Sequence, residues 1–138
     1  MTVFVDTSIW YATADMHDVG HLRARALLER FEGNLLTSDH VLVETWLLTR
    51  RRLGSALAET LVNAIREGRS QVELATLADL QVAAQIHEAF SDQGFSIVDR
   101  TSWAIMQRLG VHEALAFDRD YSIFRFGRDR RRSLTVHS

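Results

Sequence analysis

The sequence predicts a three-layer α/β/α domain with a mainly parallel central sheet, and two patterns carry this prediction. Short runs of β-branched and aliphatic residues alternate along the chain with longer segments in which apolar residues recur at helical spacing. Glycines separate many of these segments, and the chain has no proline and no internal repeat. Strands that alternate with helices are typical of a parallel sheet covered by helices. With 138 residues, 46% of them hydrophobic, we expect a single globular domain spanning residues 1–138.

The individual elements follow from the same patterns. The first strand is expected at residues 2–5, and a helix begins around Thr7 and Ser8, whose hydroxyl groups suit an N-cap. The other helices are expected where apolar residues are spaced for one helix face, at 21–31, 40–52, 55–67, 77–90 and 99–109. The other strands are expected at 35–37, 72–74, 114–117 and 134–136. The breaks between elements are expected at Gly33, Gly54, Gly68, Gly94 and Gly110.

Composition excludes several classes of protein. The chain has no cysteine, so disulfides, thiolate catalysis and cysteine-based zinc or iron–sulfur sites are ruled out. No segment approaches the ~20 consecutive apolar residues of a membrane span, and the first residues lack the basic and apolar regions of a signal peptide. We therefore expect a soluble, cytoplasmic protein without membrane contact.

Four carboxylates at the ends of apolar runs, or within them, are the strongest functional signal. They are Asp6 in VFVDTS, Glu44 in VLVETW, Asp99 in SIVDRT and Asp118 in LAFDRD. In a parallel α/β sheet ligands bind beyond the carboxyl ends of the strands, which is where Asp6 and Asp118 fall. Burying carboxylates together costs several kcal/mol unless a cation or hydrogen-bond donors compensate. Several carboxylates that converge on one site therefore indicate a hard divalent cation.

Each of these residues also has a purely structural explanation. Asp6, Asp99 and Asp118 precede expected helix starts, where aspartate is a favoured N-cap. Glu44 could occupy an exposed position on its helix. Capping does not exclude metal binding, and four acids in this pattern are harder to explain structurally than any one of them.

Other side chains are candidates for supporting roles. Asp120 is a possible accessory ligand or a surface residue, and the Thr7 and Ser8 hydroxyls could support Asp6 or act only as caps. The chain has arginine and no lysine, and two arginine clusters could contact the phosphates of a ligand, with Arg50, Arg51, Arg128 and Arg130 as candidates. The same arginines could instead form a solvated rim or bind an acidic protein.

The motifs around the four acids resemble those of PIN-domain ribonucleases, specifically VapC-type toxins. The motifs VFVDTSIW, VETWLLTRR, SIVDRTSWAIMQRLGV and EALAFDRDY occur in the family's order and cover nearly the whole chain. The resemblance implies that Asp6, Glu44, Asp99 and Asp118 hold Mg²⁺ or Mn²⁺, with Asp120 as an accessory acid. It also implies metal-dependent cleavage of RNA and neutralisation by a cognate antitoxin.

The residues are compatible with that chemistry. Carboxylates that hold one or two Mg²⁺ ions leave positions open for water and a phosphate oxygen, so metal-activated water could hydrolyse the phosphodiester. We expect products with 5′-phosphate and 3′-OH ends. The resemblance also implies a homodimer, for which apolar helical faces such as those of residues 40–65 are candidates.

Three other functions remain open. A PIN nuclease that processes RNA without an antitoxin would have the same acids, and a non-catalytic nucleic-acid-binding PIN module would have an incomplete acidic set. A phosphotransferase with an aspartyl nucleophile at DTS would need a lysine partner, and the chain has no lysine.

Overall fold

A computed structural model describes residues 1–138. Its central sheet has five parallel strands in the order β3-β2-β1-β4-β7. The strands are β1 (Val3–Val5), β2 (Leu35–Ser38), β3 (Gln71–Glu73), β4 (Glu113–Leu115) and β7 (Thr135–His137). A separate antiparallel hairpin is formed by β5 (Arg125–Phe126) and β6 (Arg132–Ser133). The predicted mainly parallel sheet is thus confirmed.

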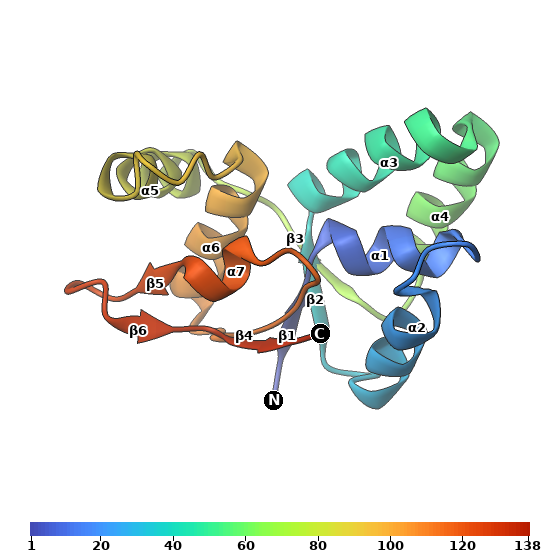
Figure 1. Ribbon diagram of the computed structural model, residues 1–138, viewed down its shortest axis with the longest axis horizontal. Helices are drawn as coiled ribbons and strands as arrows, with labels where there is room; N and C mark the ends of the chain where they lie inside the picture. Colours follow the sequence, from blue (N-terminus) through green and yellow to red (C-terminus); the bar gives the residue numbers. More distant parts are fainter.

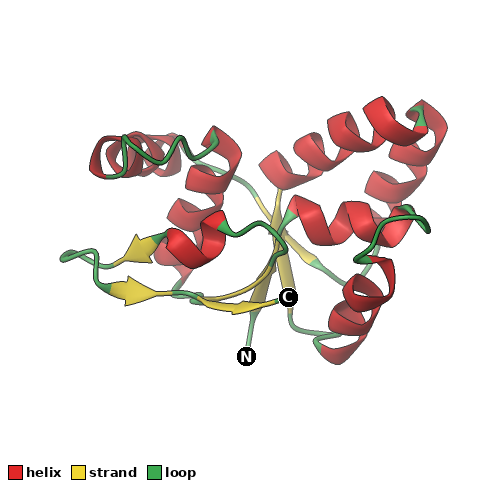
Figure 2. Ribbon diagram, in the orientation of Figure 1, coloured by secondary structure: helices red, strands yellow, loops and turns green.

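Helices cover both faces of the sheet, as the three-layer prediction requires (Figure 1; Figure 2). One side carries α1 (Thr7–Ala14), α2 (His21–Arg30), α3 (Asp39–Leu53) and α4 (Ser55–Glu67). The other side carries α5 (Leu77–Ala89), α6 (Ile97–Leu109) and the short α7 (Asp120–Ile123). No helix has the length and apolar character needed to cross a membrane.

Local sequence explains most helix boundaries. The Ser38 side chain accepts a hydrogen bond from the Val41 backbone N–H and so caps α3, and Thr76 with Asp79 forms a capping box at α5. Gly110 ends α6 in the left-handed conformation, at φ +68°, which other residues adopt only at a cost.

The structure corrects one predicted helix start. Helix α6 begins at Ile97, two residues earlier than expected, because Ser96 is its N-cap and accepts a hydrogen bond from the Asp99 N–H. Asp99 therefore lies inside the first turn and does not cap the helix, so its carboxylate is free for other contacts. By contrast, Asp6 does cap α1, as its carboxylate accepts from the Ser8 N–H.

The end of β4 also differs from the prediction. The strand stops at Leu115, whereas it was expected to continue to residue 117. The Phe117 N–H leaves the sheet and donates to the Ser8 hydroxyl at 3.0 Å, which bends the chain across the end of β1. This turn places Asp118 near the start of α1. The hairpin β5–β6 and helix α7 were not predicted, because runs of two to four residues carry no readable period.

The core that supports this edge of the sheet is aromatic. Trp103 of α6 is fully buried and stacks on Phe124, with ring centroids 4.3 Å apart, and Tyr121 meets its edge at 5.4 Å. Tyr121 and Phe124 belong to the short segment around α7. This packing fixes α7 against α6, and with it the two acidic residues that precede Tyr121.

Candidate active site

The acidic residues meet where the direction of chain winding reverses. From β1 the chain proceeds to β2 and β3 on one side, and it returns to β4 on the other side of β1. The crevice beyond the carboxyl ends of two such strands is the usual ligand site of an open α/β sheet. Asp6 directly follows β1, and Asp118 lies three residues beyond β4. The topology therefore brings together two acids that are more than a hundred positions apart in sequence.

Helices bring in the other acids. Glu44 projects from the second turn of α3, and Asp99 lies in the first turn of α6. All four predicted residues, together with Asp120, line one pocket of about 330 Å³. Its remaining walls are formed by Thr7, Ser8, Leu48, Gly94 and Ser96. The structure thus assembles the complete predicted acidic set in a single pocket.

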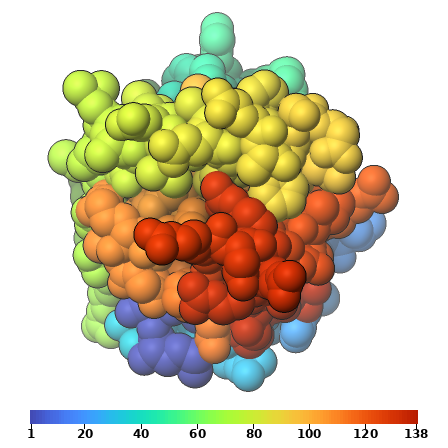
Figure 3. All heavy atoms as spheres, turned by 90° about the vertical axis from the view of Figure 1, so that its left-hand side faces the viewer, coloured from blue at the N-terminus to red at the C-terminus, as the bar shows by residue number.

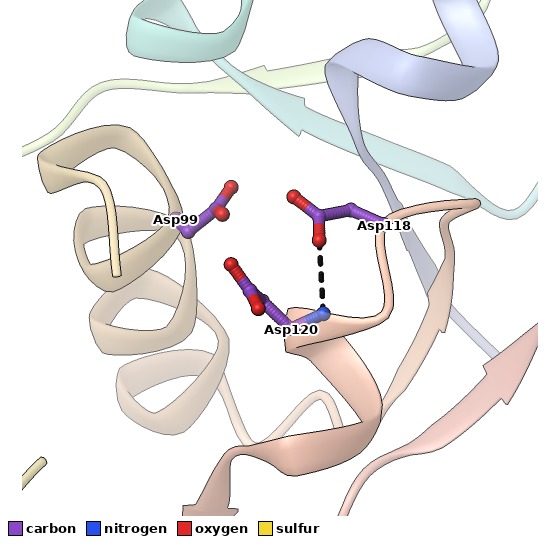
Figure 4. A group of neighbouring side chains, drawn as sticks. All are labelled: Asp99, Asp118 and Asp120. Atoms are coloured by element: carbon purple, nitrogen blue, oxygen red, sulfur yellow. Dashed lines mark hydrogen bonds between the residues drawn. The ribbon is translucent and has the colours of Figure 1, made fainter. Parts of the chain in front are cut away.

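Three of the acids form a compact group. Asp99, Asp118 and Asp120 each present a carboxylate oxygen such that these atoms lie within 4.8 Å of one another, a spacing that could hold a cation. Figure 4 shows the three side chains pointing toward a common space between α6 and the loop before α7. The Asp120 N–H donates to the Asp118 carboxylate at 2.9 Å, which orients Asp118. Asp120, which we expected to be an accessory or surface residue, lies in the pocket with the other acids.

Asp6 is held by a different set of contacts. One carboxylate oxygen accepts from the Ser8 hydroxyl at 2.6 Å and the Ser8 N–H at 3.2 Å, and the other accepts from the Tyr121 hydroxyl at 3.3 Å. Because the Ser8 hydroxyl also accepts from the Phe117 N–H, Ser8 joins the ends of β1 and β4. Ser8 is therefore both a helix-terminal residue and a positioning group for Asp6.

Burial and mutual repulsion perturb these carboxyls strongly. Burial raises the pKa of Asp6 from 3.8 to about 6, against the hydrogen bonds from Ser8 that lower it. Burial, followed by the nearby charges of Asp6 and Asp118, raises the pKa of Asp99 to about 9. Burial also raises the pKa of Asp120, with a further contribution from the charge of Asp118. Without a cation, the folded protein therefore favours protonation at this site.

The pocket has the donor chemistry that a hard cation requires. None of its five carboxylates lies within 4.0 Å of an arginine or histidine nitrogen, although six such pairs occur elsewhere in the chain. The Thr7 hydroxyl is buried at the pocket wall and has no hydrogen-bond partner. Oxygen-only ligands, uncompensated negative charge and an unpartnered hydroxyl fit a hydrated divalent cation.

Sequence reasoning missed Tyr121. Its hydroxyl is buried and donates to Asp6, and burial raises its pKa well above 10, so it remains a hydrogen-bond donor. An aromatic residue directly after the DRD motif gave a weak signal at most. Its role depends on the contact between α7 and the end of β1, which no local pattern reveals.

The predicted RNA-contacting arginines are dispersed. Arg51 lines a pocket beside the acidic one together with Thr7 and Glu44, whereas Arg50 lies over the Trp46 ring at 5.7 Å. Arg128 and Arg130 lie in the turn of the β5–β6 hairpin, which belongs to the C-terminal segment at the centre of the face seen in Figure 3. They line none of the pockets described here.

Comparisons with known proteins agree with this geometry. The PIN domain family matches residues 3–127. The 23S rRNA-specific endonuclease VapC20 of Mycobacterium tuberculosis strain CDC 1551 / Oshkosh is 37% identical over 121 residues, which cover 87% of this chain and 92% of that protein. The protein of the same name from strain ATCC 25618 / H37Rv matches equally well.

A solved structure is similar over the same extent. The crystal structure of Mycobacterium tuberculosis VapC20, described as a sarcin–ricin loop cleaving toxin, superposes with a TM-score of 0.83 and 36% identity. The match covers 88% of this chain and 94% of that one. The fold, the acidic pocket and these similarities together show that the chain belongs to the PIN-domain family, as a VapC-type endoribonuclease toxin.

Proposed function

We propose that this protein hydrolyses RNA phosphodiesters with one or two Mg²⁺ or Mn²⁺ ions held by Asp6, Glu44, Asp99 and Asp118. The observation that carries the proposal is the pocket in which these acids and Asp120 meet without any cationic side chain to compensate them. Bound divalent cations would activate water and stabilise negative charge on the phosphodiester. No histidine lines the pocket, which agrees with a mechanism that needs no imidazole base.

The protein's own residues have distinct parts in this proposal. Asp99, Asp118 and Asp120 form the most compact ligand group, while Asp6 approaches from the end of β1. Glu44 is half-buried on α3 and either completes the coordination or orients the attacking water. Ser8 and Tyr121 hold the Asp6 carboxylate by hydrogen bonds, so that it is pre-oriented before a cation arrives.

The RNA that we propose as substrate is the sarcin–ricin loop of 23S rRNA. The relatives named above act on this rRNA, and their similarity extends over nearly the whole chain. A processing nuclease that acts on other RNA would share the acidic pocket, so the choice of RNA needs a direct test.

Cleavage of total RNA by the purified protein, with and without Mg²⁺ or Mn²⁺, tests the proposal. We expect a metal-dependent cut in the sarcin–ricin loop that leaves 5′-phosphate and 3′-OH ends. Asp6→Asn and Asp118→Asn should abolish it, while the exposed Asp92→Asn serves as the matched control. Cleavage without added metal in the presence of EDTA, or 2′,3′-cyclic phosphate ends, would contradict the mechanism. Metal-dependent cuts only in other RNAs would support a processing nuclease, and no cut in any RNA would favour a non-catalytic module.

We also propose that an antitoxin inhibits the enzyme by presenting a cation, such as an arginine, to the acidic pocket. The uncompensated carboxylates support this idea, since a guanidinium would pair with them directly. Inhibition that survives alanine substitution of every arginine of the antitoxin would contradict it.

A homodimer through α3 and α4 is a further part of the proposal. Val43, Leu47 and Leu57 are 60%, 55% and 46% exposed, so apolar side chains of these helices lie uncovered in the single chain. Burying them against a second copy would remove them from water. We expect Leu47→Glu to shift the protein to a monomer in sedimentation experiments, and an unchanged sedimentation coefficient would contradict this interface.

A further inference from the structure

A second pocket adjoins the acidic one and has the opposite character. It has a volume of about 610 Å³ and lies between α1, the turn before α2 and the end of α3. Its walls are formed by Ser8, Tyr11, Asp18, Val19, Gly20, Arg23, Leu48, Arg52 and Phe117. Two of these residues, Ser8 and Leu48, also line the acidic pocket, so the two spaces share a wall. We call the second space the basic pocket, after its two arginines.

The two arginines of this pocket form no close ion pair with an Asp or Glu side chain. Arg52 and Arg23 are exposed, and no Asp or Glu oxygen lies within 4.0 Å of either guanidinium, although the charge of Arg52 helps to lower the pKa of Asp15. The Arg52 guanidinium lies over the Tyr11 ring, 5.1 Å from its centroid, and the Arg23 Nε donates to the Ser138 carbonyl oxygen at 2.8 Å. Asp18 is the one acid in the wall, and its carboxylate accepts from the Gly20 N–H at 2.8 Å. Both guanidiniums thus retain donors that could bind an anion.

The helix α3 connects the two pockets in a straight line. Glu44, Leu48 and Arg52 are spaced four residues apart and therefore lie on one face of the helix. Eight residues of helix span ~12 Å, so Arg52 lies about that far along α3 from Glu44 and the acidic pocket. An RNA chain that has one phosphate in the acidic pocket could therefore reach Arg52 with a neighbouring nucleotide. Arg51 adds a further positive charge at a third pocket, which is lined by Thr7, Glu44 and Leu48 as well.

The remaining walls offer aromatic and apolar surface. Phe117 is half-buried and the side chain of Val19 is exposed, whereas Tyr11 is buried beneath Arg52 and supports that side chain. A Cβ atom at position 20 would lie 2.6 Å from the Phe117 ring, so glycine is needed for the turn to approach this ring closely. Phe117 also immediately precedes Asp118. These two consecutive residues therefore lie in the walls of the two pockets, Phe117 in the basic pocket and Asp118 in the acidic one.

We propose that the basic pocket is a binding subsite for a nucleotide that neighbours the scissile phosphodiester, with Arg52 and Arg23 binding its phosphate. This inference rests on the proposed function, since the acidic pocket defines where the scissile phosphodiester lies. Guanidinium groups bind phosphate through paired donors, and the half-buried Phe117 ring with the exposed Val19 side chain offers apolar surface to a base. The subsite strengthens binding and orients the strand, and Arg52 and Arg23 are positioning residues without contact to the reacting atoms.

Salt-dependent RNA binding tests this inference. The probe is a short fluorescein-labelled single-stranded RNA, bound in Mg²⁺ by protein that carries Asp118→Asn, which prevents cleavage. Each phosphate contact in a single strand contributes about 0.7 to the slope of log affinity against log salt. We expect Arg52→Ala and Arg23→Ala each to weaken binding roughly tenfold and to lower the slope in part, with a reduction of about 0.7 when both arginines are replaced, because they share one phosphate. Arg52→Lys should retain most of the slope. The control is Arg66→Ala, at the exposed end of α4, for which we expect no change.

The outcomes separate this inference from the proposed function. If Arg52→Ala and Arg23→Ala bind RNA like the Arg66→Ala control, or weaken binding without changing the slope, the subsite is wrong. If Arg52→Ala and Arg23→Ala leave RNA binding unchanged and weaken only the inhibition by a protein antitoxin, the basic pocket binds a protein and the inference is overturned. If the wild-type protein cuts no RNA but binds it with a slope that depends on Arg52, the proposed function fails and the basic pocket stands only as an RNA-binding site, with no scissile phosphodiester beside it. If wild-type cleavage is intact and both variants raise the KM for RNA with little change in kcat, both stand.

Discussion

Replacing Asp99 by asparagine should stabilise the metal-free protein, because this position favours a neutral side chain. The carboxyl is 5% exposed, and burial together with the charges of Asp6 and Asp118 raises its pKa from 3.8 to about 9. Between these two pH values the folded protein binds a proton that the unfolded chain has released. Stability must therefore fall as pH rises through this range, and asparagine removes that loss.

The size of the effect follows from the range of pH over which the proton is held. Each pH unit costs about 1.4 kcal/mol for one proton, so at pH 7 the upper bound is about 4 kcal/mol. One side of the pocket is open to water, which screens the neighbouring charges, and we expect a gain of about 1–3 kcal/mol. For a chain of this length that gain is equivalent to a rise in Tm of roughly 5–10 °C.

Thermal unfolding in EDTA at pH 5, 6, 7 and 8 measures this prediction, with the exposed Asp92→Asn as control. The gain from Asp99→Asn should increase with pH, and added Mg²⁺ should stabilise the wild type more than the variant. A gain that does not depend on pH, or a variant that is less stable than the wild type at pH 8, would refute the reasoning.

Three further substitutions probe the supporting structure. In the wild type the Arg108 guanidinium donates to the buried Asp79 carboxylate at 2.9 and 3.0 Å. Arg108→Ala removes this charged partner and should lower the free energy of unfolding by about 2–3 kcal/mol at pH 7, measured by urea unfolding. Burial alone would raise the pKa of Asp79, but the hydrogen bonds from Arg108 and Thr76 outweigh burial and lower this pKa. The stability lost in Arg108→Ala should therefore shrink as pH falls below 3.8, because Asp79 then becomes protonated. Tyr121→Phe should weaken Mg²⁺ binding roughly tenfold in isothermal titration, because Asp6 loses its orienting donor. Gly110→Ala should cost about 1 kcal/mol in the same urea experiment, because its φ of +68° strains any side chain.

Each of these results has an outcome that would contradict it. Arg66→Ala removes an exposed pair with Glu67 and should change the free energy of unfolding by less than ~0.5 kcal/mol, so equal losses at Arg66 and Arg108 would argue against the buried pair. Unchanged Mg²⁺ affinity in Tyr121→Phe would show that Ser8 alone orients Asp6. A Gly110→Ala protein as stable as the wild type would show that the end of α6 relaxes without cost.

The sequence alone indicated the four acids Asp6, Glu44, Asp99 and Asp118, which the structure places in one pocket. Asp6 could be found because it ends a short apolar run, and Asp118 because it follows another, and both runs became parallel strands with their carboxyl ends at one edge. Glu44 could be found because a carboxylate amid apolar residues of a helix is unusual. These signals are local in the chain, since alternation of elements and the position of an acid at the end of one depend only on neighbouring residues.

Tertiary structure decided how these residues are held. Ser96 caps α6 in place of Asp99, and the Tyr121 hydroxyl donates to Asp6. These contacts, and the place of Asp120 in the compact acidic group, depend on where α6 and α7 pack. The basic pocket could not be read from the sequence, because Arg23 and Arg52 are far apart along the chain and come to one pocket only when α2 and α3 both pack against α1. The physical reason is that such contacts bring together segments that are distant along the chain, and their geometry is set by packing of the whole domain, which no short window of sequence contains.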